Sequence, residues 1–368
     1  MTKETNANKT DATETNVNKT NANKSNAKKT MKAVALFKYL PIEHPESLVD
    51  VEVEKPAATG RDLLVKVRAI SVNPVDYKVR SPKSREESAP RVLGWDVAGV
   101  VEQVGPDCEL FRPGDEVYYA GSITRPGGNS EYHLVDERIV GTKPSTLDYA
   151  QAAALPLTSI TAWESLYDRL GVSPDPAANA GKTILVIGAA GGVGSIAIQL
   201  AKHAGLTVIG TASRPESADW ARALGADAVI NHFEPFLPQL KAAGFGEVDY
   251  ILCLNSTEKH WANMAEAIAP QGKICSIVET DQLLNLTLLK NKSVTFVWEL
   301  MFTRSTYQTP DMIEQHNLLS EIARLVDEGK VRTTTSAVLA PINADNLRKA
   351  HAMLESGRTV GKVVLEGF

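Results

Sequence analysis

The chain has 368 residues, a formal net charge of −5 and 43% hydrophobic residues. That length allows about two domains and a sizeable core, and the mild negative charge gives no electrostatic basis for nucleic-acid binding. No run of roughly 18 apolar residues predicts a membrane span, and three scattered cysteines are too few for a disulfide framework and fit a reducing, cytoplasmic compartment.

Residues 1–30 differ in composition from the rest of the chain. They repeat a Thr-Asn-x-Asn-Lys-Thr theme, at 5–10 and again at 15–20, and they contain no aromatic residue. Such an Asn-, Thr- and Lys-rich segment buries too little surface to offset its chain entropy, so we expect a disordered tail. It lacks the apolar central run of a secretory signal.

The next part of the chain alternates short apolar runs with Gly and Pro turns. The runs predict strands at 32–38, 62–70, 97–104 and 116–120, with a strong turn signal at 112–115 before the last of them. Little helical periodicity accompanies them. We therefore expect a partly closed β-rich domain.

After residue 146 strands and helices alternate. An Ala-rich helix over 147–170, interrupted at Pro156, leads through a loop into predicted strands at 183–188, 207–211, 228–231, 248–254 and 273–278, with helices at 194–203, 217–224 and 261–268. This alternation is typical of a doubly wound parallel sheet in the α/β class. Further helices at 311–328 and 343–355 and a strand at 362–365 close the chain, and we expect 31–154 and 301–368 to form one domain around an inserted sheet domain at 155–300.

A glycine-rich loop follows the first of these strands. The run Gly188-Ala189-Ala190-Gly191-Gly192-Val193-Gly194 lies between a buried strand and a helix. Glycines there allow a tight bend, a close backbone approach to a pyrophosphate and tight helix–strand packing, while the helix N-terminus adds partial positive charge. The loop predicts dinucleotide binding through Gly188, Gly191, Gly192, Val193 and Gly194.

The end of the second strand bears on which dinucleotide binds. NAD-binding proteins usually carry Asp or Glu about 20 residues after the loop. Here the strand ends in Ser213-Arg214, and a guanidinium can pair with the 2′-phosphate of NADP. Glu216 lies close by, so use of NAD stays open, but we predict NADPH as the cofactor.

Several further motifs occur in a consistent order from Met31 to Phe368. They are 71–76 (Ser-Val-Asn-Pro-Val-Asp), 93–99 (Leu-Gly-Trp-Asp-Val-Ala-Gly), 112–117, Leu155-Pro156, 161–163, 224–226 and 361–364. With the glycine loop, they resemble the medium-chain dehydrogenase/reductase superfamily. The closest resemblance is to its zinc-free quinone oxidoreductase-like branch, whose members are often labelled zinc-type alcohol dehydrogenase-like. The resemblance implies a GroES-like catalytic domain split around a Rossmann domain, hydride transfer in the cleft between them, and a homodimer.

The resemblance also has an informative departure. Zinc alcohol dehydrogenases have a ligand Cys where Asn73 stands, a His-Glu pair where Trp95-Asp96 stands, and a third ligand Cys near Leu157. Zinc requires about four converging Cys, His or carboxylate ligands, and Asn and Trp are poor substitutes. We therefore expect no metal.

The family's cleft suggests the remaining site residues. Asn73, Tyr77 and Lys78 follow the first-domain strand where the family lines its cleft, and Lys78 offers a cationic donor for developing enolate charge. Alternatively, Asn73 and Asp76 only hold the loop, and Lys78 is a surface charge. The resemblance implies contacts of His232 and Lys362 with the cofactor, and Asn255 is expected there because it follows a strand's carboxyl end.

These observations predict an NADPH-dependent oxidoreductase that transfers hydride to a quinone or an α,β-unsaturated carbonyl without a metal. Two alternatives stay open: a zinc-type alcohol dehydrogenase, and a cofactor-binding protein with little catalysis. The expected partner is a small-molecule substrate rather than a nucleic acid or a membrane. The sequence does not identify that substrate, since pocket shape depends on residues far apart in the chain. Nor does it assign Glu299, Arg304 and Tyr307 to the substrate pocket or to the dimer edge.

Overall fold

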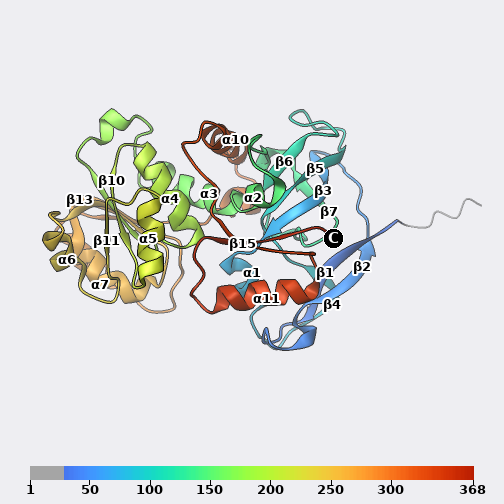
Figure 1. Ribbon diagram of the computed structural model, residues 1–368, viewed down its shortest axis with the longest axis horizontal. Helices are drawn as coiled ribbons and strands as arrows, with labels where there is room; N and C mark the ends of the chain where they lie inside the picture. Colours follow the sequence, from blue (N-terminus) through green and yellow to red (C-terminus); the bar gives the residue numbers. More distant parts are fainter. Residues whose placement is uncertain (1–28) are drawn as a thin grey trace, which may run out of the picture.

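The computed structural model describes residues 29–368, and the predicted disordered tail, residues 1–28 in particular, lies outside that part. The two described residues at its end belong to the folded chain. Thr30 begins strand β1 (Thr30–Lys38), and the carbonyl of Lys29 accepts a hydrogen bond of 2.8 Å from the backbone of Lys55. The molecule has two lobes side by side (Figure 1).

The first lobe, here called the β-rich lobe, contains two sheets. One has the order β2–β1–β4, with β2 at Val49–Glu54 and β4 at Glu86–Val92. The other runs β15–β16–β3–β5–β6–β8, and β7 also pairs with β3. Its strands are β3 (Asp62–Ser71), β5 (Val97–Val104), β6 (Glu116–Tyr119), β7 (Tyr132–Asp136), β8 (Gly141–Thr142), β15 (Thr335–Leu339) and β16 (Lys362–Glu366).

The four strands expected before residue 121 are confirmed, whereas β2, β4, β7, β8 and β15 were not predicted. The alternation Val-Asp-Val-Glu-Val-Glu could have revealed β2, because period-two patterning marks a half-buried strand. Strand β4, with its glutamates and Pro90, has poor strand propensity and forms through its pairing with β1. Because β16 pairs with β3, the C-terminal segment does return to the first domain, as expected.

The second lobe, here called the parallel-sheet lobe, has six parallel strands in the order β11–β10–β9–β12–β13–β14. In chain order this is the doubly wound 3-2-1-4-5-6 arrangement, and its switch point lies between β9 and β12. The strands are β9 (Thr183–Ile187), β10 (Thr207–Thr211), β11 (Ala228–Ile230), β12 (Val248–Cys253), β13 (Ile268–Ser276) and β14 (Thr295–Trp298).

Helices pack on both faces of that sheet and between the lobes. Those of the parallel-sheet lobe are α4 (Gly192–His203), α5 (Pro215–Ala223), α6 (Phe236–Ala242), α7 (Thr257–Ala267) and α8 (Thr287–Lys290), of which α6 and α8 were not predicted. The predicted helix over 147–170 breaks at Pro156, as expected, into α2 (Tyr149–Ala153) and α3 (Pro156–Trp163), followed by a π-helical turn at Glu164–Arg169. The remaining helices are α1 (Pro74–Arg80), α9 (Thr303–Tyr307), α10 (Glu314–Asp327) and α11 (Ala344–Glu355), with short 3-10 turns at Pro45–Ser47, Glu137–Ile139 and Pro176–Asn179.

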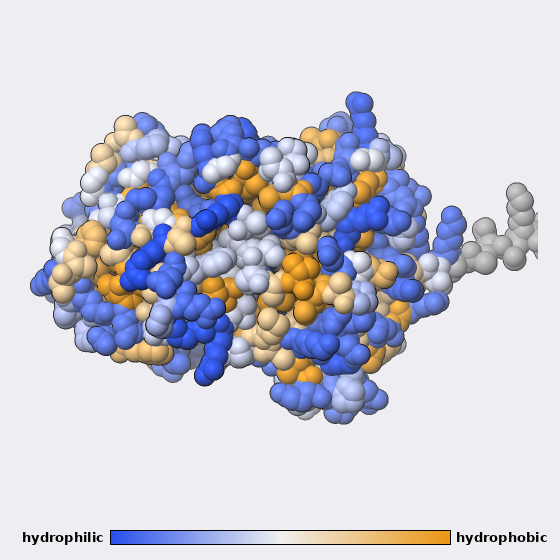
Figure 2. Space-filling view, in the orientation of Figure 1, coloured by the Kyte–Doolittle hydropathy of each residue, from blue (hydrophilic) through white to orange (hydrophobic). Residues whose placement is uncertain are grey.

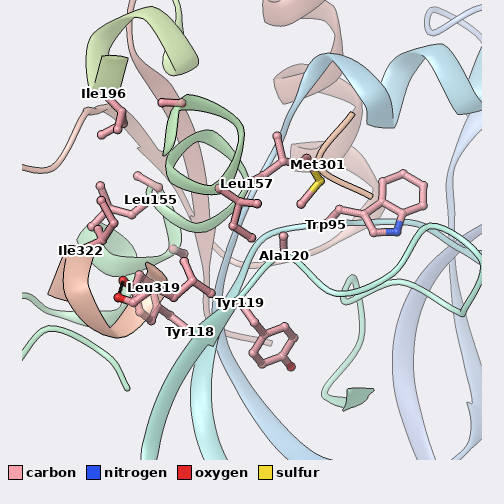
Figure 3. Packing of buried hydrophobic residues seen from close by; sticks show 14 of the residues in the cluster. Trp95, Tyr118, Tyr119, Ala120, Leu155, Leu157, Ile196, Met301, Leu319 and Ile322 are labelled. Carbon is pink, nitrogen blue, oxygen red and sulfur yellow. Dashed lines mark hydrogen bonds between the residues drawn. The ribbon is translucent and has the colours of Figure 1, made fainter. Parts of the chain in front are cut away.

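The two lobes share one hydrophobic core around α3 and α10. Leu155, Leu319 and Ile322 pack there beside Ile196 of α4 (Figure 3). Tyr118 of β6 is fully buried and donates a 2.6 Å hydrogen bond to the carbonyl of Leu319. Burial of this joint apolar surface holds the lobes together and thereby sets the geometry of the cleft.

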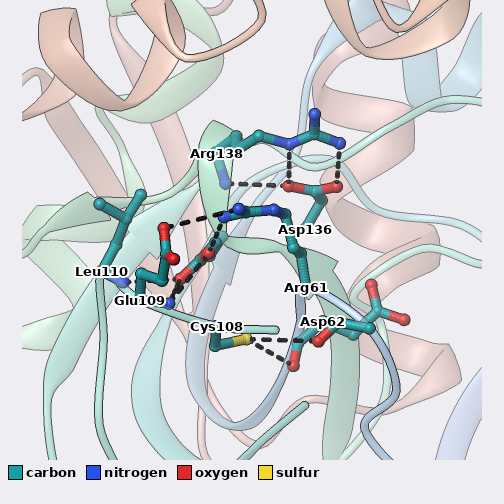
Figure 4. A network of polar contacts seen from close by, with 9 residues as sticks. Arg61, Asp62, Cys108, Glu109, Leu110, Asp136 and Arg138 are labelled. Carbon is teal, nitrogen blue, oxygen red and sulfur yellow. Dashed lines mark hydrogen bonds and ion pairs between the residues drawn. The ribbon is translucent and has the colours of Figure 1, made fainter. Parts of the chain in front are cut away.

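A buried carboxylate organises the far edge of the β-rich lobe. Glu137, with no exposed surface, accepts hydrogen bonds from the backbone of Glu109 (2.9 Å) and Leu110 (2.8 Å) and from Arg61 (2.7 Å). Figure 4 shows Arg61, Glu109 and Leu110 gathered in this polar network. The chain around 105–111 has little regular structure. Backbone carbonyls accept from Gly105, Asp107 and Cys108, and the side chain of Glu137 satisfies the donors of Glu109 and Leu110.

We expect Glu137→Gln to lower the free energy of unfolding by about 1–3 kcal/mol, the range for losing charged hydrogen bonds. The amide group of the glutamine places an N–H donor among the guanidinium and backbone N–H donors, which need an acceptor. Urea unfolding followed by circular dichroism measures the change. Glu131→Gln is not a suitable control, because the carboxylate of Glu131 also accepts a backbone hydrogen bond. Glu86→Gln, at an exposed end of β4, is the better control. A loss no larger than in Glu86→Gln would contradict the assigned role.

The surface gives no sign of a membrane span. In the part of the chain that the structure describes, every helix is too short or too polar to cross a bilayer. On the face shown in Figure 2, hydrophobic residues lie in small groups among hydrophilic ones.

Candidate functional site

The glycine loop lies at the switch point, between β9 and the N-terminus of α4. Gly188 has φ +87°, a conformation that favours glycine. A Cβ on Gly194 would lie 2.4 Å from the carbonyl oxygen of Gly188, so only glycine lets helix and loop approach this closely. The first turn of the twelve-residue helix α4 therefore presents free backbone donors and partial positive charge, which suit a pyrophosphate.

The neighbouring strand ends place Ser213 and Arg214 beside this loop. The hydroxyl of Thr211, the last residue of β10, accepts a 3.2 Å hydrogen bond from the backbone of Gly188. Arg214 is the N-cap residue of α5 and donates from Nη2 to the carbonyl of Arg358 at 2.7 Å. Ser213 is exposed and Arg214 is partly exposed, so both remain accessible to a ligand at this edge of the sheet.

His232 and Asn255 follow the next two strands. The half-buried imidazole of His232 lies 4.5 Å from the ring of Phe233 and 6.2 Å from the ring of His260, centroid to centroid, and burial lowers the pKa of His232. Asn255 is exposed, and a Cβ on Gly188 would lie 3.7 Å from its Cβ. The structure thus gathers the predicted cofactor residues along one sheet edge. Their contacts with a dinucleotide stay a prediction.

A buried polar centre lies next to the loop. Lys362, at the start of β16, is 3% exposed, and its ammonium pairs with Asp96 at 2.9 Å. It also donates to the carbonyl of Val72 at 3.0 Å and to the amide oxygen of Asn73. Asp96 in turn accepts from Ser71 at 2.8 Å, from Asn73 at 2.8 Å and from the backbone of Leu157 at 2.7 Å.

The lysine chain connects this centre to the glycine loop. A Cβ on Gly192 would lie 2.9 Å from Cδ of Lys362 and 2.9 Å from Cγ2 of Thr158. The backbone of Gly361 also donates to the carbonyl of Ala190 at 2.9 Å. The predicted residues Lys362 and Asn73 are therefore brought together, with the stem of the lysine against the loop and its ammonium turned to Asn73.

Asn73 and Asp76 begin helix α1 and have only internal partners. The amide group of Asn73 donates to Asp96 and to the carbonyl of Trp95 (3.4 Å), while its backbone donates to Asp76 at 2.7 Å. The other carboxyl oxygen of Asp76 is buried without a hydrogen-bond partner, and burial raises the pKa of Asp76 to about 7. The bond between Asn73 and Asp76 holds the loop, as the alternative supposes, whereas Asn73 also takes part in the polar centre through Lys362 and Asp96.

Tyr77 and Lys78 point to different places. Lys78 forms a 2.9 Å ion pair with Glu279, which follows β13, so this pair spans the two lobes. That hydrogen bond lowers the pKa of Glu279. Tyr77 lines a separate groove with Pro41 and Glu355. Glu279 and Thr158 were not predicted, because only the fold brings Glu279 to Lys78 and Thr158 to the glycine loop.

The residues of the polar centre do not fit a zinc ion. An amide, one carboxylate and an ammonium meet there, and the ammonium would repel a divalent cation within hydrogen-bond reach of the same carboxylate. Elsewhere in residues 29–368, groups of three or more His, Cys, Asp or Glu side chains able to hold a metal do not occur.

Comparison with known proteins agrees with this architecture. The model of the alcohol dehydrogenase GroES-like domain matches residues 59–146, and that of a zinc-binding dehydrogenase matches residues 224–365. A zinc-type alcohol dehydrogenase-like protein from Staphylococcus aureus strain MSSA476 is 45% identical over 335 residues, covering 91% of this chain and 99% of its own.

Two solved structures extend the likeness. A Rhizobium etli CFN 42 protein, provisionally named a zinc-dependent alcohol dehydrogenase, superposes with a TM-score of 0.88 at 54% identity, covering 92% of this chain and 99% of its own. Escherichia coli quinone oxidoreductase in complex with NADPH gives a TM-score of 0.74 at 25% identity, covering 91% and 99%. The expected Rossmann sheet inserted in a GroES-like domain is confirmed, and the chain belongs to the medium-chain dehydrogenase/reductase superfamily, in its quinone oxidoreductase-like branch.

Proposed function

We propose that this oxidoreductase uses NADPH to reduce a quinone or an α,β-unsaturated carbonyl without a metal. The observation that carries the proposal is the buried centre of Lys362, Asp96 and Asn73. It supplies a fixed positive charge where the zinc enzymes of the superfamily are expected to have a metal. Without a Lewis acid, the chemistry best suited to the cleft is hydride addition to an already activated acceptor.

The bound dinucleotide would supply the hydride, while this chain binds and orients both reactants. Lys78 is the assigned donor to the substrate oxygen, on which negative charge develops. Its ammonium is 43% exposed and pairs with a carboxylate that is itself 77% exposed, so exchanging Glu279 for a substrate costs little. Asn73 is assigned to position the cleft wall and water to provide the final proton, whereas Tyr77 lines the separate groove with Pro41 and Glu355 and is given no contact with the substrate.

Stopped-flow measurement of NADPH oxidation with a panel of quinones and enones tests this function. We expect saturable oxidation with at least one acceptor class. Saturable cofactor binding without turnover on any acceptor would leave a cofactor-binding protein with little catalysis. Plasma emission analysis of the purified protein addresses the zinc-dependent alternative, and stoichiometric zinc would overturn our proposal for the polar centre.

Arg214 is the proposed determinant of cofactor choice, because its guanidinium can pair with a 2′-phosphate that NADH lacks. We expect Arg214→Ala to raise the Kd for NADPH about tenfold or more, the range for a lost charged hydrogen bond, and to leave the Kd for NADH nearly unchanged. Fluorescence titration with both cofactors measures the ratio. Arg222→Ala, at an exposed position of α5, is the control. Equal weakening of both cofactors would refute the assignment.

The proposed assembly is a homodimer joined at β14. This edge strand of the six-stranded sheet ends at Trp298, which is 47% exposed, and Leu300 just beyond it is 59% exposed, with Glu299 buried between them. Tyr307, 76% exposed, lies in the helix that follows. An open apolar strand edge is costly for a monomer in water and suited to pairing with a second copy.

Replacing Trp298 and Leu300 together by Lys is expected to weaken self-association at least about tenfold, since aromatic anchors dominate interface energies. Sedimentation velocity across a concentration series measures the dimer fraction. The matched control is Val338→Lys, an exposed apolar residue on β15 in the other lobe. A doubly substituted protein that sediments like the wild type would exclude the β14 edge.

A further inference from the structure

A pocket with polar and apolar walls lies between the β-rich lobe and the segment from α9. The loop after β6 lines one side of it with Ser122, Thr124 and Arg125, and the segment from α9 lines another with Ser305, Thr306 and Gln308. This pocket belongs to no site described above. Its position relative to the polar centre is set by one side chain, Trp95.

Trp95 touches both places. Its indole donates a 3.3 Å hydrogen bond to the carbonyl of Ser122 in the pocket wall. Its own carbonyl accepts from the amide of Asn73, and the next residue, Asp96, holds Lys362. Trp95 therefore contacts the pocket wall through its indole and the polar centre through its backbone carbonyl.

A second aromatic ring packs against it. Phe302 meets Trp95 edge to face, with ring centroids 6.2 Å apart and planes at 73°. Trp95 is 1% exposed and Phe302 is 3% exposed. The carbonyl of Phe302 accepts from Ser305, another residue of the pocket wall, at 3.1 Å. Met301, beside Trp95 in Figure 3, extends the same apolar wall toward Leu157.

The charges in the pocket are already compensated. Arg125 forms two bonds with Asp62, at 2.7 and 3.1 Å. Asp136, also in the lining, pairs with Arg138 at 2.8 Å. Besides these ion pairs, the lining offers hydroxyls, the amide of Gln308 and the apolar side chains of Leu134, Val135, Ile139 and Met312, which together favour an uncharged molecule with carbonyl oxygens over a carboxylate or a phosphate ester.

We infer that an uncharged quinone or enone enters through this pocket, and that Trp95 and Phe302 determine how large a molecule reaches the polar centre. This inference rests on the proposed function. Because the two rings are packed edge to face, a thin one-ring acceptor is expected to pass after a small rotation of Phe302. A wider fused-ring acceptor needs the space that the phenylalanine ring occupies.

The test measures binding and not only turnover. Isothermal titration calorimetry with the NADP⁺-saturated full chain compares p-benzoquinone with the three-ring phenanthrenequinone in the wild type, Phe302→Ala and Trp95→Phe. We expect Phe302→Ala to bind the larger quinone about tenfold more tightly, and to change the Kd of the smaller one by less than about threefold, as hydrophobic pocket size discriminates. Trp95→Phe should act in the same direction more weakly.

A third variant guards against a fold effect of these buried changes. Thr306→Trp fills the half-buried pocket wall from α9 and should weaken both quinones about tenfold, while the Kd for NADPH stays the same. An unchanged ratio of the two Kd values in Phe302→Ala and Trp95→Phe would overturn the inference, as would unchanged binding in Thr306→Trp or no binding of either quinone to the wild type. Binding that shifts as expected without NADPH oxidation would instead leave the inference standing and refute the reductase function.

Discussion

Lys362→Met is expected to lower the free energy of unfolding by about 3–5 kcal/mol, the cost of leaving a buried charge without its partner. The ammonium is 3% exposed, and the carboxylate of Asp96 has no exposed surface at all. Methionine matches the length of the stem but provides no charge and no donor. Asp96 keeps its bonds from Ser71, Asn73 and Leu157, which are too weak to replace an ion pair in this environment.

Urea unfolding of single and double variants distinguishes an uncompensated charge from a simple packing defect. Adding Asp96→Asn to Lys362→Met removes the orphaned charge, so the double variant should regain at least half of the lost stability. Lys66→Met, at an exposed position of β3, controls for the loss of any lysine. A double variant no more stable than Lys362→Met would show that the ion pair is not what stabilises the centre.

The same substitution should affect the cofactor site. Because the stem of Lys362 lies against Gly192, a shift of β16 moves the backbone of the phosphate loop. A weaker Kd for NADPH is therefore expected in Lys362→Met at temperatures where the variant is folded. This readout links the C-terminal strand to the loop independently of turnover.

Glu299→Gln is expected to remove much of the loss of stability that the wild type shows as the pH rises. The carboxyl of Glu299 is 3% exposed, and one of its oxygens is buried without a hydrogen-bond partner. Burial, together with the nearby charge of Glu164, raises the pKa of Glu299 to about 9, although Arg169, at 2.6 Å, opposes the rise. Arg304 neutralises Glu164 itself at 2.6 Å.

The raised pKa determines the sign of the effect. The folded state keeps this proton above pH 4.5, where the unfolded chain releases it. The stabilisation is therefore complete below that pH, and it is lost as the pH rises toward 9, by at most about 1.4 kcal/mol per pH unit. A glutamine cannot ionise, so the variant should gain stability relative to the wild type as the pH rises through this window.

The difference in stability between the variant and the wild type reports on Glu299, because other titrating groups contribute to both proteins. Asp76 is one of them, and its raised pKa acts in the same direction at lower pH. Urea midpoints at intervals between pH 5 and pH 9 provide it. Glu86→Gln, at an exposed position, should show no such trend. Parallel curves for Glu299→Gln and the wild type would mean that Glu299 is ionised throughout.

Local patterns were enough to predict the fold. Buried strand runs that alternate with helical segments predict the parallel sheet, because periodicity and glycine placement are properties of neighbouring residues. The glycine loop and Ser213-Arg214 are likewise each a short run of neighbouring residues, so both can be recognised in the sequence. Strand β4 and the π-helical turn at Glu164–Arg169 went unpredicted, since pairing with β1 and packing against distant segments outweigh their own propensities.

The polar centre is built from residues that lie far apart in the chain. The sequence by itself determined that a dinucleotide-type loop is present and that the positions of Asn73 and Trp95 lack zinc ligands. Only the tertiary structure decided that Lys362, which is 266 positions from Asp96, provides the cation there, and that Lys78 reaches Glu279 across the cleft. A buried charge selects its partner by distance in space, and that distance depends on how β16 returns to β3, which no short stretch of the chain encodes.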